Sequence, residues 1–377
     1  MQKQENLIDS FDGFGLRFFT GVPDSLLNDF CNLLLSSLPG AQHVMAANEG
    51  NAIAIAAGHY LATGEVPVVY MQNSGIGNAM NPLLSLAHGT VYAIPMVLVI
   101  GWRGDPAVTD HAQHRRQGEL TPVLLEDMDI PFRVLANEET LMDDFKWAAE
   151  QARQISSPVA LVVKKGILSR KDKKQGYPKS ELMSREEAIS VVLDACGPEA
   201  VYLATTGRAT RELHAQLQTR GWQNGGEFLN VGSMGHVSSV GLGVALAAPS
   251  RRVVVLDGDA AAVMHMGSLA TIGRYHPANL VHVVLNNGVN ESVGGQESAG
   301  LKICLAKIAS ACGYSACMRR VNSALELKAA LTSYQGRSRP LFVDVAIRQG
   351  IRFGLAKLTI DHKMISEGLL KNLREGV

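Results

Sequence analysis

The stretch from residue 256 to residue 296, LDGDAAAVMHMGSLATIGRYHPANLVHVVLNNGVNESVGGQ, decides the fold of this chain. An apolar run ends in Gly258-Asp259, a helical segment follows, and a second apolar run ends in Asn286-Asn287. The order strand, helix, strand predicts a parallel β-α-β unit. Ligands of open α/β sheets bind in the crevice outside the carboxyl ends of such strands. The sequence therefore predicts a binding site at this edge of the sheet.

A carboxylate and a carboxamide follow the two predicted strands, from Asp259 and from Asn286-Asn287. Hard oxygen donors of this kind suit Mg²⁺ or Ca²⁺ that bridges to a phosphate. An Asp at a strand end and an Asn-Asn-Gly turn are also common in α/β proteins without any metal. The pair by itself leaves both interpretations open.

Strands and helices alternate along the rest of the chain. Short apolar runs, which are typical of buried parallel strands, lie at 16–21, 66–72, 94–101, 158–166, 201–207, 227–235, 252–258, 279–287 and 340–347. Helices are predicted at 23–38, 48–63 and 185–196. The last of these begins with a capping box, Ser184 with Glu187. The alternation predicts an α/β protein with two domains, each a mostly parallel sheet flanked by helices.

The polar segment 171–184, KDKKQGYPKSELMS, interrupts this alternation and predicts a linker. We therefore expect one domain at 1–170 and a second at 185–377. A surface loop within a single domain is the alternative. The length of 377 residues exceeds what one ordinary domain holds, which favours two.

Composition and charge exclude several classes of protein. Hydrophobic residues make up 46% and charged residues 19%, and the formal net charge is zero, so neither a nucleic-acid surface nor disorder is indicated. No apolar run is long enough to span a membrane, and the first fifteen residues lack the apolar core of a signal peptide. The odd number of cysteines, five, without paired metal spacing predicts reduced thiols. We expect a cytoplasmic protein.

Two further motifs follow predicted strands of the second half. In TTG (205–207), hydroxyls and a glycine enter a helix and can present N–H groups to an anion; a simple helix N-cap explains them equally well. In GSMG (232–235), the glycines by themselves favour close packing of helix on sheet.

Glu49 is the notable acid of the first half. It lies in ANEGNAIAIAAGHYLATG, among alanine, glycine and isoleucine, where a carboxyl group is poorly solvated and suited to proton transfer. The alternative is an acid at a helix start, stabilised by the helix dipole.

The chain resembles the phosphonopyruvate decarboxylase family, close relatives of the sulfopyruvate decarboxylases, over nearly its whole length. The motifs that carry the resemblance are TGVPDSLL (20–27), ANEGNAIAIAAG (47–58), YMQNSGIGNAMNPLLSL (70–86), GWRG (101–104), QH (113–114), TTGR (205–208), GSMGHVSS (232–239) and NGVNESVGGQ (287–296). Such enzymes use thiamine diphosphate and Mg²⁺, and their signature is Gly-Asp-Gly followed about two dozen residues later by Asn-Asn. Here 25 residues, 261–285, separate the two parts.

The resemblance implies a pyrimidine-binding domain at 1–170 and a diphosphate-binding domain at 185–377. It also implies a homo-oligomer whose active sites lie at subunit interfaces. Glu49 would sit beside N1′ of the pyrimidine, and Met234 would bend the cofactor. The implied metal ligands are Asp259, Asn287 and the carbonyl of Val289. Further implied cofactor contacts are Thr205, Thr206, Gly207, Gly232, Ser233, Gly258, Ala260 and Ala261.

The implied substrate is a 2-oxo acid with a phosphonate group, so cations are needed. Arg103 and His114 are the candidates for binding and catalysis. Arg115 and Arg116 could also bind the substrate, but a run of solvated surface charges explains this pair at least as well. Further candidates to line the substrate pocket are Asp24, Ser25, Gln72, Asn73 and Ser74.

The expected reaction is decarboxylation of 3-phosphonopyruvate to phosphonoacetaldehyde in phosphonate biosynthesis. Sulfopyruvate is the alternative substrate. A non-catalytic paralogue is the alternative of another class, because the signature has Gly where this chain has Ala260. Asn286 and Asn290 also replace a more usual Asp and His of the family pattern, and DHAQH (110–114) a more usual Asp-Glu-Pro-Gln-His.

Overall fold

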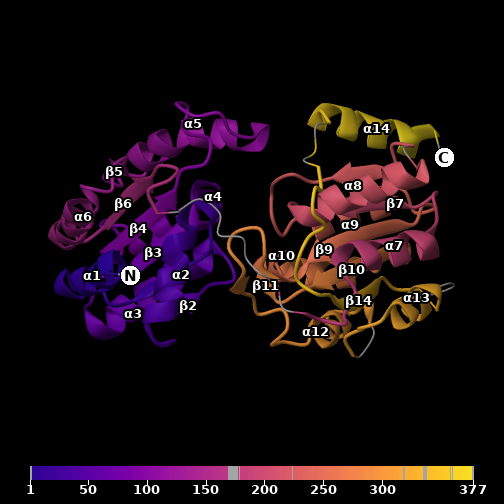
Figure 1. Ribbon diagram of the computed structural model, residues 1–377, viewed down its shortest axis with the longest axis horizontal. Helices are drawn as coiled ribbons and strands as arrows, with labels where there is room; N and C mark the ends of the chain where they lie inside the picture. The colour runs from indigo at the N-terminus through magenta and orange to yellow at the C-terminus, as the bar shows by residue number, and fades with distance from the viewer. Residues whose placement is uncertain are drawn as a thin grey trace. The chain divides into compact units, whose positions relative to one another are not determined.

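The computed structural model describes residues 2–168, 177, 179–222, 224–316, 319–333, 338–356, 358 and 360–375. The chain divides into two compact units, Met1–Gln175 and Gly176–Val377, called unit 1 and unit 2 below. Within the described residues, each unit is built around one six-stranded sheet (Figure 1). Of the predicted linker 171–184, residues 171–176 and 178 lie outside the described residues.

Unit 1 is a parallel sheet between two helical layers. Its strands are β1 (Phe19–Gly21), β2 (His43–Met45), β3 (Val68–Gln72), β4 (Met96–Gly101), β5 (Phe132–Leu135) and β6 (Pro158–Val163). Its helices are α1 (Gln2–Gly13), α2 (Asn28–Ser37), α3 (Glu49–Thr63), α4 (Ile76–Pro82), α5 (Ala112–Asp127) and α6 (Leu141–Ile155), with shorter turns at η1 (Ser25–Leu27), η2 (Asn73–Gly75) and η3 (Leu83–Ala87). One face of the sheet packs against α1, α2 and α6, and the other against α3, α4 and α5.

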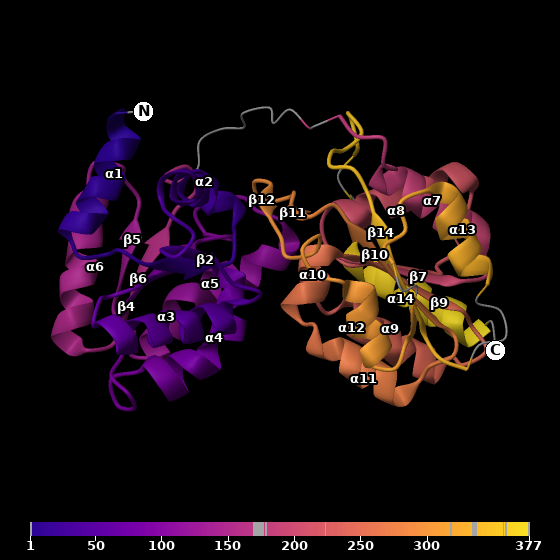
Figure 2. The same cartoon turned by 90° about the horizontal axis from the view of Figure 1, so that it is seen from below.

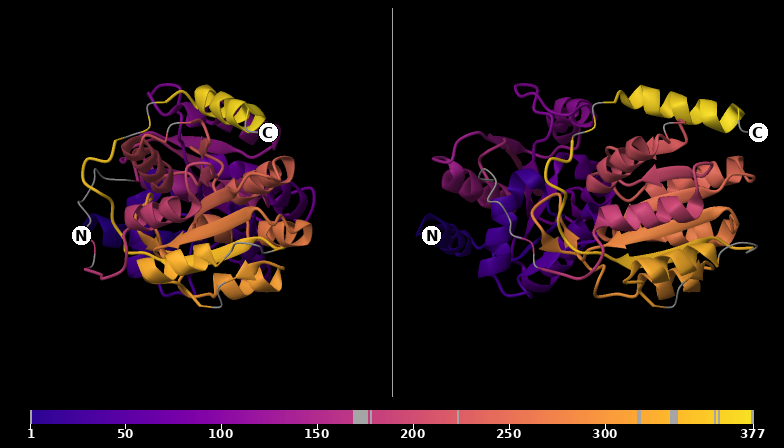
Figure 3. Two further views of the ribbon diagram at one scale, coloured as in Figure 1. Left: turned by 90° about the vertical axis from the view of Figure 1, so that its right-hand side faces the viewer. Right: turned by 45° about the vertical axis from the view of Figure 1, so that its right-hand side comes forward.

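Unit 2 repeats this layered plan. Its strands are β7 (Val201–Ala204), β8 (Glu227–Leu229), β9 (Val253–Gly258), β10 (Leu280–Asn286), β13 (Ser315–Ala316) and β14 (Leu341–Ala346), with a hairpin of β11 (Val289–Asn290) and β12 (Gln296–Glu297). Its helices are α7 (Arg185–Cys196), α8 (Arg208–Arg220), α9 (Val237–Ala247), α10 (Asp259–Met264), α11 (Gly267–Tyr275), α12 (Leu305–Ala311), α13 (Ala324–Thr332) and α14 (His362–Glu375). Helices α7, α8 and α13 cover one face and α9, α11 and α12 the other (Figure 2). Helix α14 lies along β8 at one edge of the sheet (Figure 3).

The two sheets have the same strand order. Sheet one runs β2-β1-β3-β4-β6-β5, and sheet two, read from β8, runs β8-β7-β9-β10-β14-β13. Numbered within each unit, both orders are 2-1-3-4-6-5, and the strand pairs in both sheets are parallel. The direction of winding reverses between the first and third strands, which is where open α/β sheets bind ligands. The predicted fold class is confirmed.

The strands of the two six-stranded sheets that the sequence failed to predict lie at sheet edges. They are β2, β5 and β13; the short hairpin strands β11 and β12 were not predicted either. An edge strand is partly exposed, so it carries no continuous apolar run; in β5 only Leu135 is fully buried. The predicted strands are shorter in the structure than the apolar runs that predicted them. The predicted helix 23–38 is divided into η1 and α2. Helix α7 and its capping box are confirmed.

Two further observations concern the length of the helices and the state of the cysteines. Among the described residues, no helix is long and apolar enough to cross a membrane. Cys31 is buried, whereas Cys196, Cys304 and Cys312 are half-buried, and these four are free thiols. Cys317 lies outside the described residues.

Candidate active site

A salt bridge between Arg103 and Asp110 organises the strand ends of unit 1. Arg103 follows β4 and donates from Nε and Nη2 to the two carboxylate oxygens of Asp110, both at 2.7 Å. Asp110 also accepts from the backbone N–H groups of Gly104 at 3.0 Å and His111 at 2.8 Å. Burial would raise the pKa of Asp110, but these bonds and the guanidinium charge hold it well below its ordinary value. The remaining guanidinium nitrogen, Nη1, lies 3.4 Å from Ser25 Oγ.

Asp24 follows β1 and has a buried carboxyl group. The nearby charge of Arg103 favours the ionised form of this group. Its Oδ2 accepts from Leu26 N at 3.0 Å and so caps the turn η1. Its Oδ1 is buried without a partner among the described residues. Burial raises the pKa of Asp24 to about 6, against the opposing effects of hydrogen bonds and Arg103. A Cβ at Gly101 would lie 2.2 Å from Asp24 Oδ2, so any larger residue there would have to displace the carboxylate.

The other predicted substrate residues of unit 1 differ in their surroundings. Asn73 is buried and holds the backbone of Arg103, since it donates to the carbonyl at 2.8 Å and accepts from the N–H at 3.1 Å. Gln72 has a buried Oε1 without a partner in the described part of the chain. Ser74 is exposed. Burial, followed by the charge of Arg103, lowers the pKa of His114 to about 4, so its ring is neutral at pH 7.

Glu49 is the first residue of α3 and is only 5% exposed. Its Oε2 accepts from Asn78 Nδ2 at 2.7 Å. A Cβ at Gly75 would lie 2.5 Å from this side chain, so only glycine fits there. Gly75 and Asn78 both belong to the QNSGIGN motif, which therefore packs against Glu49. The exposed Arg115 and Arg116 are part of a solvated run, in which Arg116 pairs with Glu119.

In unit 2, Asp259 and Asn287 meet at the ends of β9 and β10. Asp259 is 3% exposed, and its Oδ2 accepts from the hydroxyl of Ser298. Burial raises the pKa of Asp259 to about 6, while hydrogen bonds from Ser298 and from the Asn287 backbone N–H act against this shift. Asn287 Oδ1 accepts from Val289 N at 3.2 Å. The three predicted metal-binding residues are therefore neighbours.

The loop that carries Ser298 closes against this pair. A Cβ at Gly300 would lie 2.4 Å from Asp259 Cβ, so the backbone approaches the carboxylate closely. Asn286 holds the loop, because its Nδ2 donates to Gly300 O at 2.8 Å and to Asp344 Oδ1 at 3.0 Å. Asp344 is also bound by Arg320 Nε at 2.8 Å.

Ala260 lies in the first turn of α10, one residue after Asp259. Ala260 is not among the described non-glycine residues that have a positive φ angle. The backbone at this position therefore does not require glycine. Ala260 is half-buried, whereas Ala261 is buried.

The TTG segment lies next to the strand end of β9. A Cβ at Gly258 would be 3.8 Å from Thr205 Cγ2, and the hydroxyl of Thr205 is buried without a partner among the described residues. Gly207 has φ +101° and is the N-cap of α8, so its backbone conformation favours glycine. Thr206 is half-buried.

The GSMG segment folds onto the end of α10. Ser233 and Gly235 have φ +46° and +83°. A Cβ at Gly235 would lie 2.6 Å from the ring of His265, which contacts the tilted ring of His236 with ring centroids 4.2 Å apart. Gly232 and Met234 are half-buried. The predicted cofactor residues of unit 2 thus come together around the ends of β7, β9 and β10.

The residues present fit a magnesium diphosphate group. A buried carboxylate whose raised pKa reflects desolvation, a carboxamide oxygen and a backbone carbonyl form an all-oxygen donor set of the kind Mg²⁺ prefers. The unpartnered hydroxyl of Thr205 and the glycine-lined entry to α8 suit an anionic ligand alongside. Within the described residues no group of three or more His, Cys, Asp or Glu side chains could hold a metal instead.

Sequence reasoning missed several residues of this site. Asp110 and Asn78 stood inside quoted motifs, but only the fold shows that they bind Arg103 and Glu49. Ser298 follows the opening stretch and gave no signal, because a single serine in a loop predicts nothing.

Comparison with known proteins defines the class. Residues 1–123 match the thiamine pyrophosphate enzyme, N-terminal TPP binding domain, and residues 205–345 match the thiamine pyrophosphate enzyme, C-terminal TPP binding domain. The solved benzoylformate decarboxylase from Polynucleobacter necessarius is similar at 12% identity and a TM-score of 0.38, over 93% of this chain and 99% of that one. The two family matches identify the chain as a thiamine pyrophosphate enzyme.

Two curated relatives narrow the class. The phosphonopyruvate decarboxylase of Streptomyces viridochromogenes is 34% identical over 93% of this chain and 90% of its own length. The sulfopyruvate decarboxylase of Methanosarcina acetivorans is 27% identical over 92% of both chains. The chain belongs to the phosphonopyruvate decarboxylase family of thiamine-pyrophosphate-dependent carboxy-lyases.

Proposed function

We propose that this protein decarboxylates 3-phosphonopyruvate to phosphonoacetaldehyde and CO₂, a step of phosphonate biosynthesis. The observation that carries the choice of substrate is the half-buried Arg103, whose Nη1 makes only a long contact to Ser25 at 3.4 Å. A planar guanidinium held on its other edge by Asp110 can bind phosphonate oxygens without moving. Asp24, Gln72, Asn73, Ser74 and His114 are the other residues proposed to line or support this pocket.

Unit 2 is proposed to hold the cofactor. Asp259, Asn287 and the carbonyl of Val289 bind Mg²⁺, which neutralises the diphosphate. Thiamine diphosphate, when bound, supplies the electron sink that accepts the electron pair left when CO₂ departs. The proposed contacts beyond the metal ligands are Thr205, Thr206, Gly207, Gly232, Ser233, Met234, Gly258, Ala260 and Ala261.

Unit 1 is proposed to supply the proton chemistry. Glu49 holds a proton at a carboxylate oxygen and shares it with the pyrimidine ring of the cofactor. Burial and the single bond from Asn78 support this role, because few competing donors surround the carboxylate. The neutral His114 is suited to accept or donate a proton at its ring nitrogens near Arg103.

The proposed domains are a pyrimidine-binding domain at 1–170 and a diphosphate-binding domain at 185–377. We propose further that Glu49 of one chain acts on cofactor held by Asp259 of a second copy. Mixing Glu49→Gln chains with Asp259→Asn chains tests this, since exchange of subunits should restore about a quarter of wild-type activity. No recovery after verified exchange would contradict sites at subunit interfaces. The cytoplasmic location stays a prediction.

Sulfopyruvate is the second candidate substrate. With His114 neutral and Arg103 paired to Asp110, this group offers little net positive charge, which suits a singly charged sulfonate. Release of CO₂ should be measured with both acids side by side over a range of concentrations. A higher kcat/KM for phosphonopyruvate is expected; turnover of sulfopyruvate alone would reject the first proposal.

A non-catalytic paralogue is the alternative of another class. Calorimetric titration with thiamine diphosphate and Mg²⁺ distinguishes it. Saturable, metal-dependent binding is expected, because Asp259 and Asn287 are in place and Ala260 has an ordinary helical backbone. Absence of binding would favour the paralogue.

A further inference from the structure

Glu291 is a buried carboxylate outside the predicted site, in the turn between β11 and β12 of the metal-binding hairpin. Its side chain is 6% exposed. It pairs with Arg185 and with Arg208 Nη1, the latter at 3.2 Å. It also accepts from Asn287 Nδ2 at 3.3 Å and from the backbone N–H of Gly350. Its oxygens therefore connect a proposed metal ligand to the starts of α7 and α8 and to the segment after β14.

A second carboxylate, Glu212 on α8, completes the charge cluster. Arg185 Nη1 donates to Glu212 Oε1 at 3.1 Å, so Arg185 is shared between two acids. Glu212 is 2% exposed, and its Oε2 has no partner among the described residues. Burial raises its pKa to about 7. Glu212 thus belongs to the same cluster as Glu291 but is bound far less completely, and among the described residues its hydrogen bond goes to Arg185 and not to Asn287.

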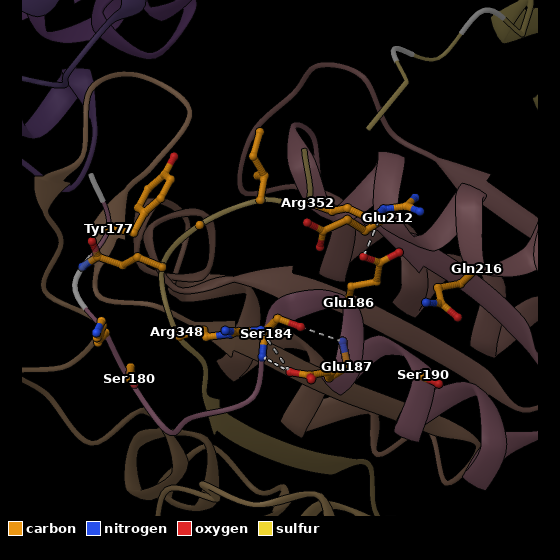
Figure 4. A pocket seen from close by; sticks show the side chains of 14 residues that line it. Tyr177, Ser180, Ser184, Glu186, Glu187, Ser190, Glu212, Gln216, Arg348 and Arg352 are labelled. Carbon is orange, nitrogen blue, oxygen red and sulfur yellow. Dashed lines mark hydrogen bonds and ion pairs between the residues drawn. The ribbon is translucent and has the colours of Figure 1, made fainter. Parts of the chain in front are cut away.

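Of the residues in this cluster, Glu212 lines a cavity of about 980 Å³ in unit 2. Glu212, Glu186 and Arg352 line it together (Figure 4). Gly350, the donor to Glu291, lines it too and has φ +116°. Gly350 therefore links Glu291 to the lining of this cavity.

The contact with Glu291 decides how Asn287 faces. A carboxamide offers an acceptor oxygen on one side and a donor nitrogen on the other. Glu291, an acceptor, fixes the nitrogen of Asn287 on its own side, which leaves Oδ1 to accept from Val289 N at 3.2 Å. Partners that orient a metal ligand in this way typically change metal affinity by about 10–100-fold.

We propose that Glu291 is the positioning residue for Asn287, and that Arg185 and Arg208 hold Glu291 in place. The inference rests on the proposed metal site. It adds that affinity for Mg²⁺ depends on a carboxylate that does not touch the ion. It also adds that the neighbouring Glu212, an acid of the same cluster, lacks this role.

The test compares Glu291→Gln with Glu212→Gln and with Glu297→Gln, which removes an exposed partner of Lys302 on the same hairpin. Calorimetry measures binding of Mg²⁺ at saturating thiamine diphosphate. Glu291→Gln should weaken binding by about 10–100-fold, while the other two variants bind as the wild type does. Equal losses in Glu291→Gln and Glu212→Gln would overturn the proposal, because cluster stability would then explain both.

Hydrogen exchange of residues 287–298 in the metal-free protein is the second readout. Glu291→Gln should speed exchange in this segment, and Glu212→Gln should not. If the wild type binds no Mg²⁺, the proposed cofactor site fails, and exchange alone decides whether Glu291 holds the hairpin. Should Glu291→Gln not fold, Arg208→Lys replaces it, since Arg208 is 22% exposed and tolerates change better. Unchanged exchange and unchanged Mg²⁺ binding in that variant would also overturn the proposal.

Discussion

Units 1 and 2 have the same sheet order but different chemistry at matching strand ends. After the first, third and fourth strands, unit 1 carries Asp24, Asn73 and Arg103, whereas unit 2 carries Thr205, Asp259 and Asn287. Unit 1 has an internal ion pair and a buried acid, and unit 2 has hydroxyl, amide and carboxylate oxygens lined by glycines. The shared topology therefore places the strand ends in the same way in both units. The residues at those ends decide whether they carry charged groups, as in unit 1, or the oxygen donors proposed to hold a metal ion, as in unit 2.

The largest expected effect is in unit 1. Glu49→Gln keeps the size of the side chain and its contact with Asn78, but it removes the exchangeable carboxyl proton. Activity should fall by about 10²–10⁴-fold, while calorimetry shows little change in cofactor binding, because the proposed metal ligands and diphosphate contacts lie in unit 2. Glu65→Gln, at a partly exposed site beyond α3, serves as the control with full activity. An active Glu49→Gln enzyme would reject the division of roles.

Asn286→Asp should produce the next largest effect, on stability of unit 2. The new carboxylate would face Gly300 O and Asp344, which the amide now satisfies at 2.8 and 3.0 Å. Loss of these bonds in a buried setting should cost on the order of 1–3 kcal/mol. Urea unfolding measures it, with Asn290→Asp, a half-buried site, as the comparison. Equal stability of both variants would show that this network does not fix the loop.

Asp24→Asn should reveal a smaller, pH-dependent effect in unit 1. The folded protein keeps the proton of Asp24 up to about pH 6, against an ordinary pKa of 3.8. Between these values the folded state binds more protons than the unfolded state, so wild-type stability falls as pH rises from about 4 to 6. Asparagine does not titrate. The Tm of the variant relative to the wild type should therefore rise across this window and level off above it; calorimetry showing a constant difference would refute the buried acid.

Ala260→Gly should have the smallest effect. Because Ala260 already has a helical backbone, restoring the glycine of the signature gains no conformational freedom that the site needs. Glycine should lower stability by up to about 1 kcal/mol through helix propensity. Cofactor affinity, followed by calorimetry, should stay the same. A gain on the order of tenfold would mean that the methyl group hinders the diphosphate.

Much of the candidate site could be predicted from local sequence patterns. The apolar runs before Gly258-Asp259 and before Asn286-Asn287 predict neighbouring parallel strands, and parallel strands bring their carboxyl ends to one edge. Glu49 could be singled out because an acid among small apolar residues is unusual. Edge strands such as β2 and β5 could not be predicted, because a strand exposed at the sheet edge lacks a continuous apolar pattern.

The sequence by itself determined the fold class and the family, and it predicted the strand ends that carry the candidate site. Those features depend on local patterns and on motifs along the chain. Only the tertiary structure decided which side chains satisfy one another: Asp110 with Arg103, Asn78 with Glu49, and Glu291 with Asn287. The last of these pairs belongs to a cluster that joins α7, α8 and the hairpin, and its Arg185 is 106 residues from Glu291. Contacts of that kind arise from packing between distant elements, for which a single sequence carries no periodic signal.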